Sequence, residues 1–124
     1  MDMADPRGNR DPSYTLDPKD LAIRVEKALG KPPLYAPDFT LVTEENEILR
    51  GRDATTCLEE RGVEPVINAA LGSRSGGGFL LVYERISSAI RFDEPWPAPA
   101  ASVIELDSDL RVIERRDYGG FIRG

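Results

Sequence analysis

The sequence predicts a single α+β domain: a capped helix near the start, two short central helices and a mainly antiparallel sheet of about four to five strands. Three observations support this fold class: a helix start signal at Asp17, an aromatic and branched run from Phe79, and alternating segments on either side of Asp107. The C-terminal half supplies most of the predicted sheet. A length of 124 residues suits one hydrophobic core.

We expect the domain to span residues 16–116. Residues 1–15 contain prolines and charges without an apolar period, and so predict an irregular N-terminal tail. Residues 117–124 are rich in glycine and predict a second tail.

The first helix has the clearest signals in the chain. Asp17 can cap its start, Pro18 suits the first helical position, and Leu16 is spaced to contact Leu21 as a hydrophobic staple. Gly30 is placed to end the helix. One apolar stripe follows at helical spacing: Leu21, Val25, Ala28 and Leu29.

The central part of the chain predicts a hairpin followed by two short helices. Residues 39–43 and 47–50 are typical of paired strands around a polar turn. Asp53 can cap a helix over residues 54–61 that ends at Gly62, and residues 65–71 suit a second helix that ends at Gly72.

Residues 79–92 predict one long or bulged strand, because this run is aromatic and branched and follows glycines. A hairpin that turns at Ser87 and Ser88 is the competing interpretation. If the strand is unbroken, we expect its core face to hold these side chains: Leu80, Val82, Glu84, Ile86, Ser88, Ile90 and Phe92.

The last third predicts an extended connection and then a second hairpin. Prolines across residues 93–101 argue against a central strand there. Residues 102–106 and 110–115 are typical of strands joined at residues 107–109, with Ile104 and Leu106 on one face and Val103 and Glu105 on the other.

Composition excludes several kinds of chemistry. The chain has no histidine, which removes the commonest general base near neutral pH and the commonest nitrogen ligand for metals. Cys57 is the single cysteine, so we interpret it as a packing residue. The run of Asp107, Ser108 and Asp109 lacks the glycine and glutamate of a calcium loop. We therefore expect no metal and no cofactor.

Charge and hydropathy restrict the partners. A net charge of −6 disfavours nucleic acid and anionic membranes, and favours another protein with a basic surface. The longest apolar runs are too short for a membrane helix, and the first residues lack a signal-peptide pattern. We expect a cytoplasmic protein. Nothing in the sequence argues against a homo-oligomer.

Glu84 is a weak candidate for proton transfer. In an unbroken strand it would point into an apolar face, where burial raises the pKa of a carboxyl group. A bulge, an edge position or an arginine partner would each give Glu84 an ordinary structural role. If a ligand pocket exists on this sheet, we expect its lining to include Tyr83, Arg85 and Arg91.

Trp96 is the candidate for partner binding. It lies between Pro95 and Pro97, and flanking prolines lower the entropy cost of presenting a large rigid side chain. Alternatively, this tryptophan closes one end of the core. Its neighbours in the proposed contact are Phe92, Asp93 and Glu94.

The glycine-rich loop over residues 72–78 leads into a strand rather than a helix, so we interpret it as a linker and not an anion site. Without a catalytic constellation, the first hypothesis is a protein-binding module: an inhibitor, an immunity-type protein or an accessory protein. The alternative is a small enzyme or ligand-binding protein with a pocket on the concave sheet face around Glu84.

Overall fold

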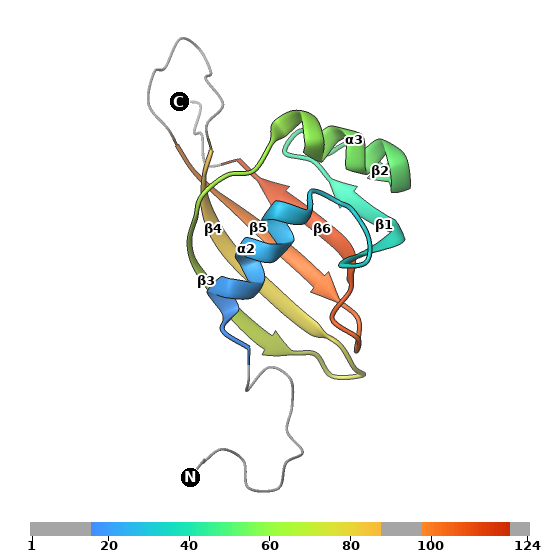
Figure 1. The fold of residues 1–124 in the computed structure, drawn as a ribbon, viewed down its shortest axis with the longest axis vertical. Helices are drawn as coiled ribbons and strands as arrows, with labels where there is room; N and C mark the ends of the chain where they lie inside the picture. The colour runs from blue at the N-terminus through green and yellow to red at the C-terminus, as the bar shows by residue number, and fades with distance from the viewer. Residues whose placement is uncertain (1–15, 88–97, 120–124) are drawn as a thin grey trace, which may run out of the picture.

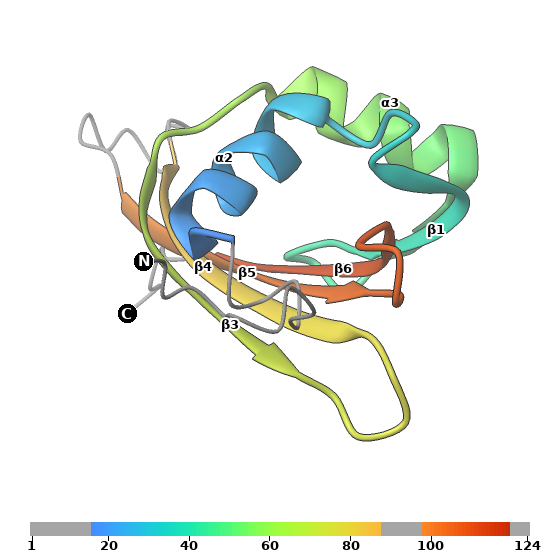
Figure 2. The ribbon, with the colours of Figure 1, turned by 60° about the horizontal axis from the view of Figure 1, so that its bottom comes forward.

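The computed structural model describes residues 16–87 and 98–119, and shows two helices against one face of a curved six-stranded sheet (Figures 1 and 2). The helices are α2 (Pro18–Ala28) and α3 (Gly51–Arg61). The strands are β1 (Tyr35–Val42), β2 (Ile48–Arg50), β3 (Val66–Ser73), β4 (Phe79–Ser87), β5 (Ala98–Leu106) and β6 (Val112–Tyr118).

The strand order is β2-β1-β6-β5-β4-β3. All neighbours pair antiparallel except β1 and β6, which run parallel. The sheet is therefore mixed and has six strands, where the sequence predicted four to five in a mainly antiparallel arrangement. Strand β6 also runs to Tyr118, two residues past the expected end of the domain.

Helix α2 forms as its sequence predicts. The carboxylate of Asp17 accepts a hydrogen bond of 3.1 Å from the backbone N–H of Lys19, and Pro18 begins the helix. Leu21 and Val25 are buried against the sheet. The helix ends where Leu29 and Gly30 adopt positive φ angles.

The second predicted helix, expected over residues 54–61, is α3, which begins earlier, at Gly51. It ends at Arg61, before Gly62, as expected. Its N-cap position is Arg50, which makes no side-chain cap, so Asp53 lies in the first turn instead. No helix in the described ranges is long and apolar enough to cross a membrane.

The third predicted helix is wrong, because residues 65–71 lie mostly within strand β3. This strand pairs along its length with β4, with a bulge between Val66 and Asn68. Alanine and leucine favour a helix in isolation, but pairing with a neighbouring strand overrides that weak preference. The loop that follows is the β3–β4 hairpin turn.

Strand β5 overturns the expectation that residues 93–101 hold no central strand, since it begins at Ala98. Pro99 is tolerated because β6 pairs with β5 only from Ala101 onward. At Pro99, strand β5 has a neighbouring strand on one side only, so it is locally an edge strand. Proline lacks a backbone N–H, and at an edge this costs no hydrogen bond between strands. The β5–β6 hairpin and the inward faces of Ile104 and Leu106 are confirmed.

The predicted core face of β4 is also wrong. Its buried side chains are Phe79, Leu81, Tyr83 and Arg85, whereas the expected core residues Leu80, Val82 and Glu84 face outward. The physical reason is that buried acids on other elements compensate Arg85, so the face of Phe79, Leu81 and Tyr83 can turn inward. Residues 88–97 lie outside the described part of the chain, so continuity beyond Ser87 is untested.

Candidate functional site

The structure separates the side chains that the sequence grouped around Glu84. Glu84 is exposed on the outer face of the sheet and accepts a 2.7 Å hydrogen bond from the Asn68 side chain. Tyr83 and Arg85 are fully buried on the inner face. The proton-transfer hypothesis required Glu84 to be buried, and in the structure it is exposed. Five other candidates lie outside the described residues: Arg91, Phe92, Asp93, Glu94 and Trp96.

The inner face carries a buried ion-pair network that starts at Glu26. This carboxylate lies in the last turn of α2 and is 1% exposed. One of its oxygens, Oε1, accepts hydrogen bonds from the Tyr83 hydroxyl at 2.7 Å and from Arg115 at 3.2 Å. The other, Oε2, accepts from the backbone N–H of Glu64 at 3.1 Å and pairs with Arg61.

Asp117 on β6 is the second acidic centre of this network. Its Oδ1 accepts hydrogen bonds from Ser102 at 2.7 Å and from Arg115 Nε at 2.8 Å, and its Oδ2 accepts from Arg61 at 3.3 Å. Burial alone would raise the pKa of Asp117, but Arg115, Arg85 and Arg61 outweigh burial and lower it. Asp117 is thus held as a carboxylate.

Arg85 completes the network from β4. It donates 2.9 Å to the Ser102 hydroxyl and pairs with the buried carboxylate of Glu64. Three arginines thus face three buried acids: Arg61, Arg85 and Arg115 against Glu26, Glu64 and Asp117. A fourth, less buried carboxylate, that of Glu44, lies 3.6 Å from Arg85.

The polar groups of the network find their partners within the protein. In residues 16–87 and 98–119, every buried side-chain nitrogen and oxygen has a hydrogen-bond partner. Burial raises the pKa of Tyr83 well above its usual value, and Glu26 adds to this effect while Arg115 opposes it. The phenol therefore stays protonated and donates to Glu26. Buried polar groups that are fully satisfied in this way fix a unique packing.

Sequence reasoning missed this network because its members are far apart in the chain. One signal was present: Glu26 lies four residues after Ala22 and next to Val25, on the edge of the apolar stripe of α2. A charged residue at such a position implies a buried partner.

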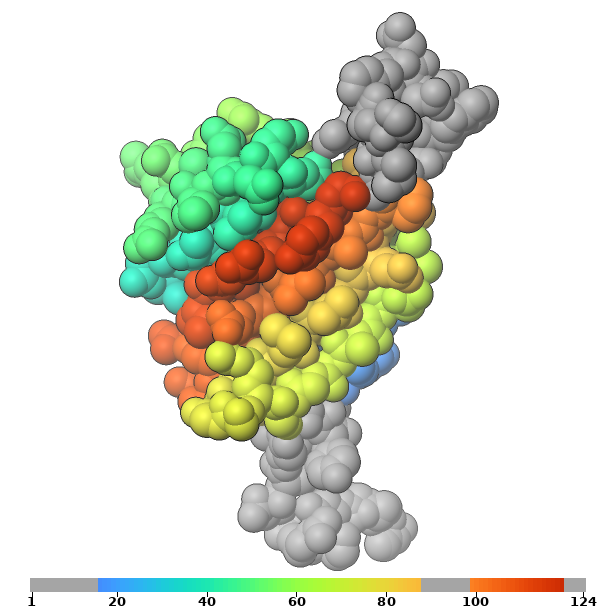
Figure 3. All heavy atoms as spheres, turned by 180° about the vertical axis from the view of Figure 1, so that it is seen from behind, coloured from blue at the N-terminus to red at the C-terminus, as the bar shows by residue number. Residues whose placement is uncertain are grey.

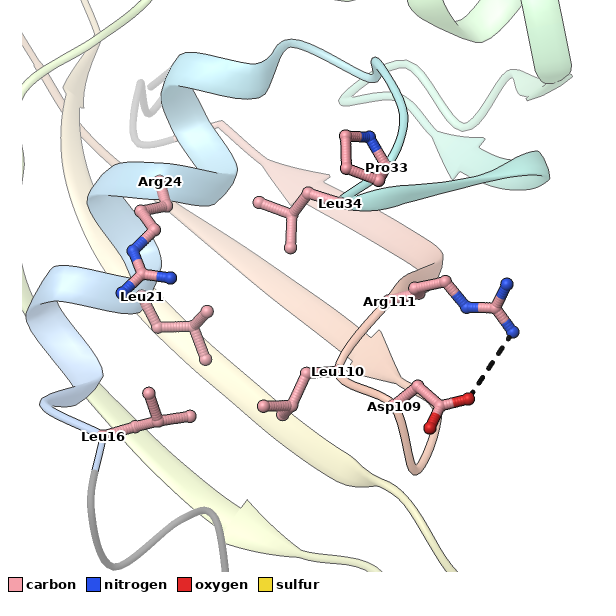
Figure 4. A pocket seen from close by; sticks show the side chains of 8 residues that line it. All are labelled: Leu16, Leu21, Arg24, Pro33, Leu34, Asp109, Leu110 and Arg111. Carbon is pink, nitrogen blue, oxygen red and sulfur yellow. Dashed lines mark ion pairs between the residues drawn. The ribbon is translucent and has the colours of Figure 1, made fainter.

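An open pocket of about 590 Å³ lies beside the N-terminal half of α2. Figure 4 shows leucine side chains from the start of α2, from the segment before β1 and from the β5–β6 turn that point into a shared space. The wall residues are Leu16, Leu21, Pro33, Leu34 and Leu110, and the charged residues at its edge are Arg24, Asp109 and Arg111.

Local structure explains why these leucines meet. Leu16 and Leu21 flank the capped start of α2, as the staple spacing predicts. Leu34 precedes β1, and its carbonyl accepts from the backbone N–H of Val112 at 2.8 Å. Leu110 is placed by the β5–β6 turn, where it adopts a φ of 65°. Helix, loop and turn thus each supply part of one apolar wall.

The arginines at the edge differ in their partners. Arg111 is paired with Asp107 at 3.0 Å and with Asp109 at 4.0 Å, and its side chain points away from the leucines (Figure 4). Arg24 is exposed and pairs with no carboxylate in the described ranges. Among the described residues, Arg24 therefore places a positive charge without an ion-pair partner beside an apolar pocket.

A smaller pocket of about 320 Å³ lies between α2 and the segment before β3. Glu26 and Glu64 form part of its wall, but their carboxylates are engaged by arginines, so they offer little to a ligand. Cys57 is half-buried, and burial raises the pKa of its thiol, which agrees with a packing residue.

Comparisons with known proteins give a fold but no function. Neither a protein-family model nor a curated protein matches the chain by sequence. The chain is similar to an NTF2-like protein with a cystatin-like fold from Novosphingobium aromaticivorans, at a TM-score of 0.62 and 12% identity over 94% of this chain and 91% of that one.

A second similar structure is an NTF2-like protein of unknown function from Pseudomonas aeruginosa. The TM-score is 0.54, with 15% identity over 86% of this chain and 97% of the other. Structural similarity at such low sequence identity shows the fold alone. With two helices on a mixed six-stranded sheet, the chain has the NTF2-like α+β fold.

Proposed function

We propose that this protein binds a compact, mainly apolar molecule that carries one anionic group. The observation that supports this function is the leucine-lined pocket with Arg24 at its edge, an arginine that has no ion-pair partner among residues 16–87 and 98–119. Its volume of about 590 Å³ lies within the range typical of small-molecule sites. Apolar walls supply affinity by removing ligand surface from water, and one charge fixes orientation.

Binding is favoured over catalysis by the chemistry of the lining. The ionisable groups at this pocket are two arginines and Asp109, and Asp109 is exposed. General acid–base catalysis usually needs a carboxyl, histidine or similar group whose pKa is tuned toward neutrality. The proposal keeps the ligand-binding alternative predicted from the sequence but moves its location from Glu84 to the far side of the sheet.

The protein-binding module stays a prediction, because residues 92–96 lie outside the described ranges. Three related points also stay predictions: that it acts as an inhibitor, an immunity-type protein or an accessory protein, that its partner has a basic surface, and that it is cytoplasmic.

The test uses 1-anilinonaphthalene-8-sulfonate, a fluorescent apolar anion, and octanoate as its competitor. We expect fluorescence enhancement with the folded chain and displacement by octanoate. Leu34→Trp fills the pocket and should abolish both. Ile67→Trp adds the same side chain on the exposed β3 strand and should leave both unchanged.

Charge selectivity gives a second readout. Arg24→Gln should weaken octanoate roughly threefold to tenfold, which is about 1 kcal/mol, and leave octanol unaffected. If Leu34→Trp folds and still binds the dye, while Val82→Asp on the outer face loses it, the dye binds the sheet and the proposed pocket function is wrong.

A further inference from the structure

Strand β3 forms one edge of the sheet, and in residues 16–87 and 98–119 no strand pairs with its outer side. Figure 3 shows it in yellow-green as the outermost band, with blue atoms of α2 visible beyond it. Antiparallel strands alternate between bonded and non-bonded pairs, and the N–H of Arg74 donates to the Gly78 carbonyl at 3.0 Å. Ala69 and Leu71 lie at non-bonded positions of the same register, so their backbone N–H and C=O groups point away from β4.

This edge lacks the features that usually protect an edge strand. Natural sheets protect their edges with very short strands, charged side chains or proline. The opposite edge, β2, follows this rule, because it has three residues and ends in Arg50. Strand β3 has eight residues, none of them charged and none of them proline, and a bulge disrupts only its start, between Val66 and Asn68. The rest of β3 is therefore a template to which an extended segment can add as a further strand.

Helix α2 presents a basic face beside this edge. Ile23 and Lys27 line the smaller pocket together with Val66, the first residue of β3, and Lys19 shares their face of the helix because it lies four residues before Ile23. Lys19 and Lys27 are exposed, and neither has an ion-pair partner within the part of the chain that the structure describes. The single exposed acid of α2 is Asp20. Although the whole chain has a net charge of −6, positive charge around an apolar centre lies next to β3.

We propose that β3 binds an extended acidic peptide of another protein, which adds to the sheet as a further strand. Backbone hydrogen bonds to Ala69 and Leu71 supply affinity, as in other complexes formed by strand addition. Every second side chain of the peptide lies on the inner face of the sheet, where apolar groups meet Ile23 and acidic groups meet the two lysines. This site and the leucine-lined pocket at Arg24 lie on opposite sides of α2, so it is independent of the small-molecule function.

Charge favours this partner over a second copy of the chain. Two β3 edges that pair antiparallel about a two-fold axis would form one continuous sheet, with both α2 helices on the same face. Lys19 and Lys27 of both copies would then lie on the same side of the junction, where like charges disfavour the contact. An acidic segment replaces this repulsion with attraction.

The experiment uses the full chain and a short labelled peptide with valine at alternate positions, threonine between them and glutamate at both ends. We expect saturable binding by fluorescence anisotropy. The same peptide with lysine at both ends should bind roughly tenfold more weakly. In the complex, the amide protons of Ala69 and Leu71 should exchange with solvent more slowly than in the free protein, as measured by nuclear magnetic resonance.

The lysines are tested by the double variant Lys19→Gln and Lys27→Gln. It should weaken the glutamate peptide roughly tenfold and remove the preference over the lysine peptide. Lys31→Gln is the matched control, because Lys31 follows the helix and pairs with Glu59 at 3.0 Å, and it should leave binding unchanged. These changes are at exposed side chains, so the variants should fold as wild type does.

Proline tests the backbone of the edge. Ala69→Pro removes an N–H that points away from β4, so it should keep the sheet and weaken the peptide at least tenfold. Ile48→Pro makes the same change on the opposite edge: the Thr43 N–H donates to the Glu47 carbonyl at 2.9 Å, which leaves the Ile48 N–H pointing away from β1. Ile48→Pro should leave binding unchanged, and circular dichroism establishes that both variants are folded.

Four results would overturn the proposal: no saturable binding of the glutamate peptide, equal binding of the lysine peptide, full binding by a folded Ala69→Pro variant, or loss of binding in a folded Ile48→Pro variant. Self-association of wild type that Ala69→Pro abolishes would assign the edge to a second copy and would also overturn it. If Ala69→Pro does not fold, the amide exchange of Ala69 and Leu71 decides, and unchanged exchange in the presence of saturating peptide excludes this edge.

Discussion

The Tyr83 hydroxyl, in the middle of β4, donates a hydrogen bond of 2.7 Å to Glu26 Oε1, in the last turn of α2. This bond joins the helix to the sheet at the point where both are fully buried. Hydrogen bonds to buried charged groups contribute more to stability than neutral ones.

Tyr83→Phe removes this donor and keeps the ring. We expect the free energy of unfolding to fall by about 2 kcal/mol, because Glu26 loses one of its donors in a buried site. Urea denaturation measures the change. Tyr118→Phe is the control: Tyr118 is 51% exposed, and its variant should change stability by less than about 0.5 kcal/mol. Equal effects would mean that the buried bond contributes nothing.

Asp117→Asn should remove an acid-sensitive part of the stability. The pKa of Asp117 is lowered in the fold from its usual 3.8, so below that value the unfolded chain binds a proton more readily than the folded chain. The contribution of this carboxylate is therefore complete above about pH 4 and is lost as pH falls through the lowered pKa.

Unfolding measured from neutral pH down to pH 3 should show the Asn variant less stable at neutral pH by roughly 3 kcal/mol and less sensitive to acid. Asp109→Asn, at a side chain that is 78% exposed, should follow the wild-type curve. If the Asp117 variant loses stability with falling pH as steeply as wild type does, this acid sensitivity does not come from Asp117.

Arg85 and Glu64 should be strongly coupled, because both are almost completely buried. Arg85→Met and Glu64→Gln each remove one partner of a buried ion pair and should each cost about 3 to 5 kcal/mol. The double variant should cost less than the two together by about 1 to 3 kcal/mol.

The same cycle on the exposed pair Lys31 and Glu59 is the control, with an expected coupling below about 1 kcal/mol. Chemical denaturation at neutral pH measures both cycles. Additive effects at Arg85 and Glu64 would show that the two side chains act independently.

Gly78→Ala should destabilise the β3–β4 hairpin. Gly78 has a φ of 87°, and an added Cβ would clash with the Leu106 carbonyl oxygen. We expect a loss of roughly 3 kcal/mol in thermal unfolding. Gly77→Ala separates the two causes, because Gly77 also has a positive φ but open space around it, and should cost only about 1 kcal/mol. Equal losses would assign the whole effect to backbone strain.

Local signals in the sequence were reliable where one element specifies itself. The cap and staple of α2, the hairpin from β1 to β2 and the β5–β6 turn all follow from residues close together in the chain. The Leu16 and Leu21 staple, predicted as a helix signal, also turned out to line the pocket.

Features that depend on distant residues were missed. Strand β3 exists because β4 pairs with it, and its own alanines suggested a helix. The inward face of β4 depends on Glu64 and Asp117, which compensate Arg85 from other segments. A pattern of apolar residues alone assigns the outward side chains Leu80 and Val82 to the core, since it contains no information about buried arginine partners.

The parallel pairing of β1 with β6 determines when the sheet can be completed during synthesis of the chain. Residues 35–42 find their sheet partner only in residues 112–118, so β1 and β2 have no sheet to join while the ribosome is still making the middle of the chain. Contacts between such distant segments form slowly, because a long loop must close first. Strand β1 is thus synthesised long before β6, the strand that secures it in the sheet.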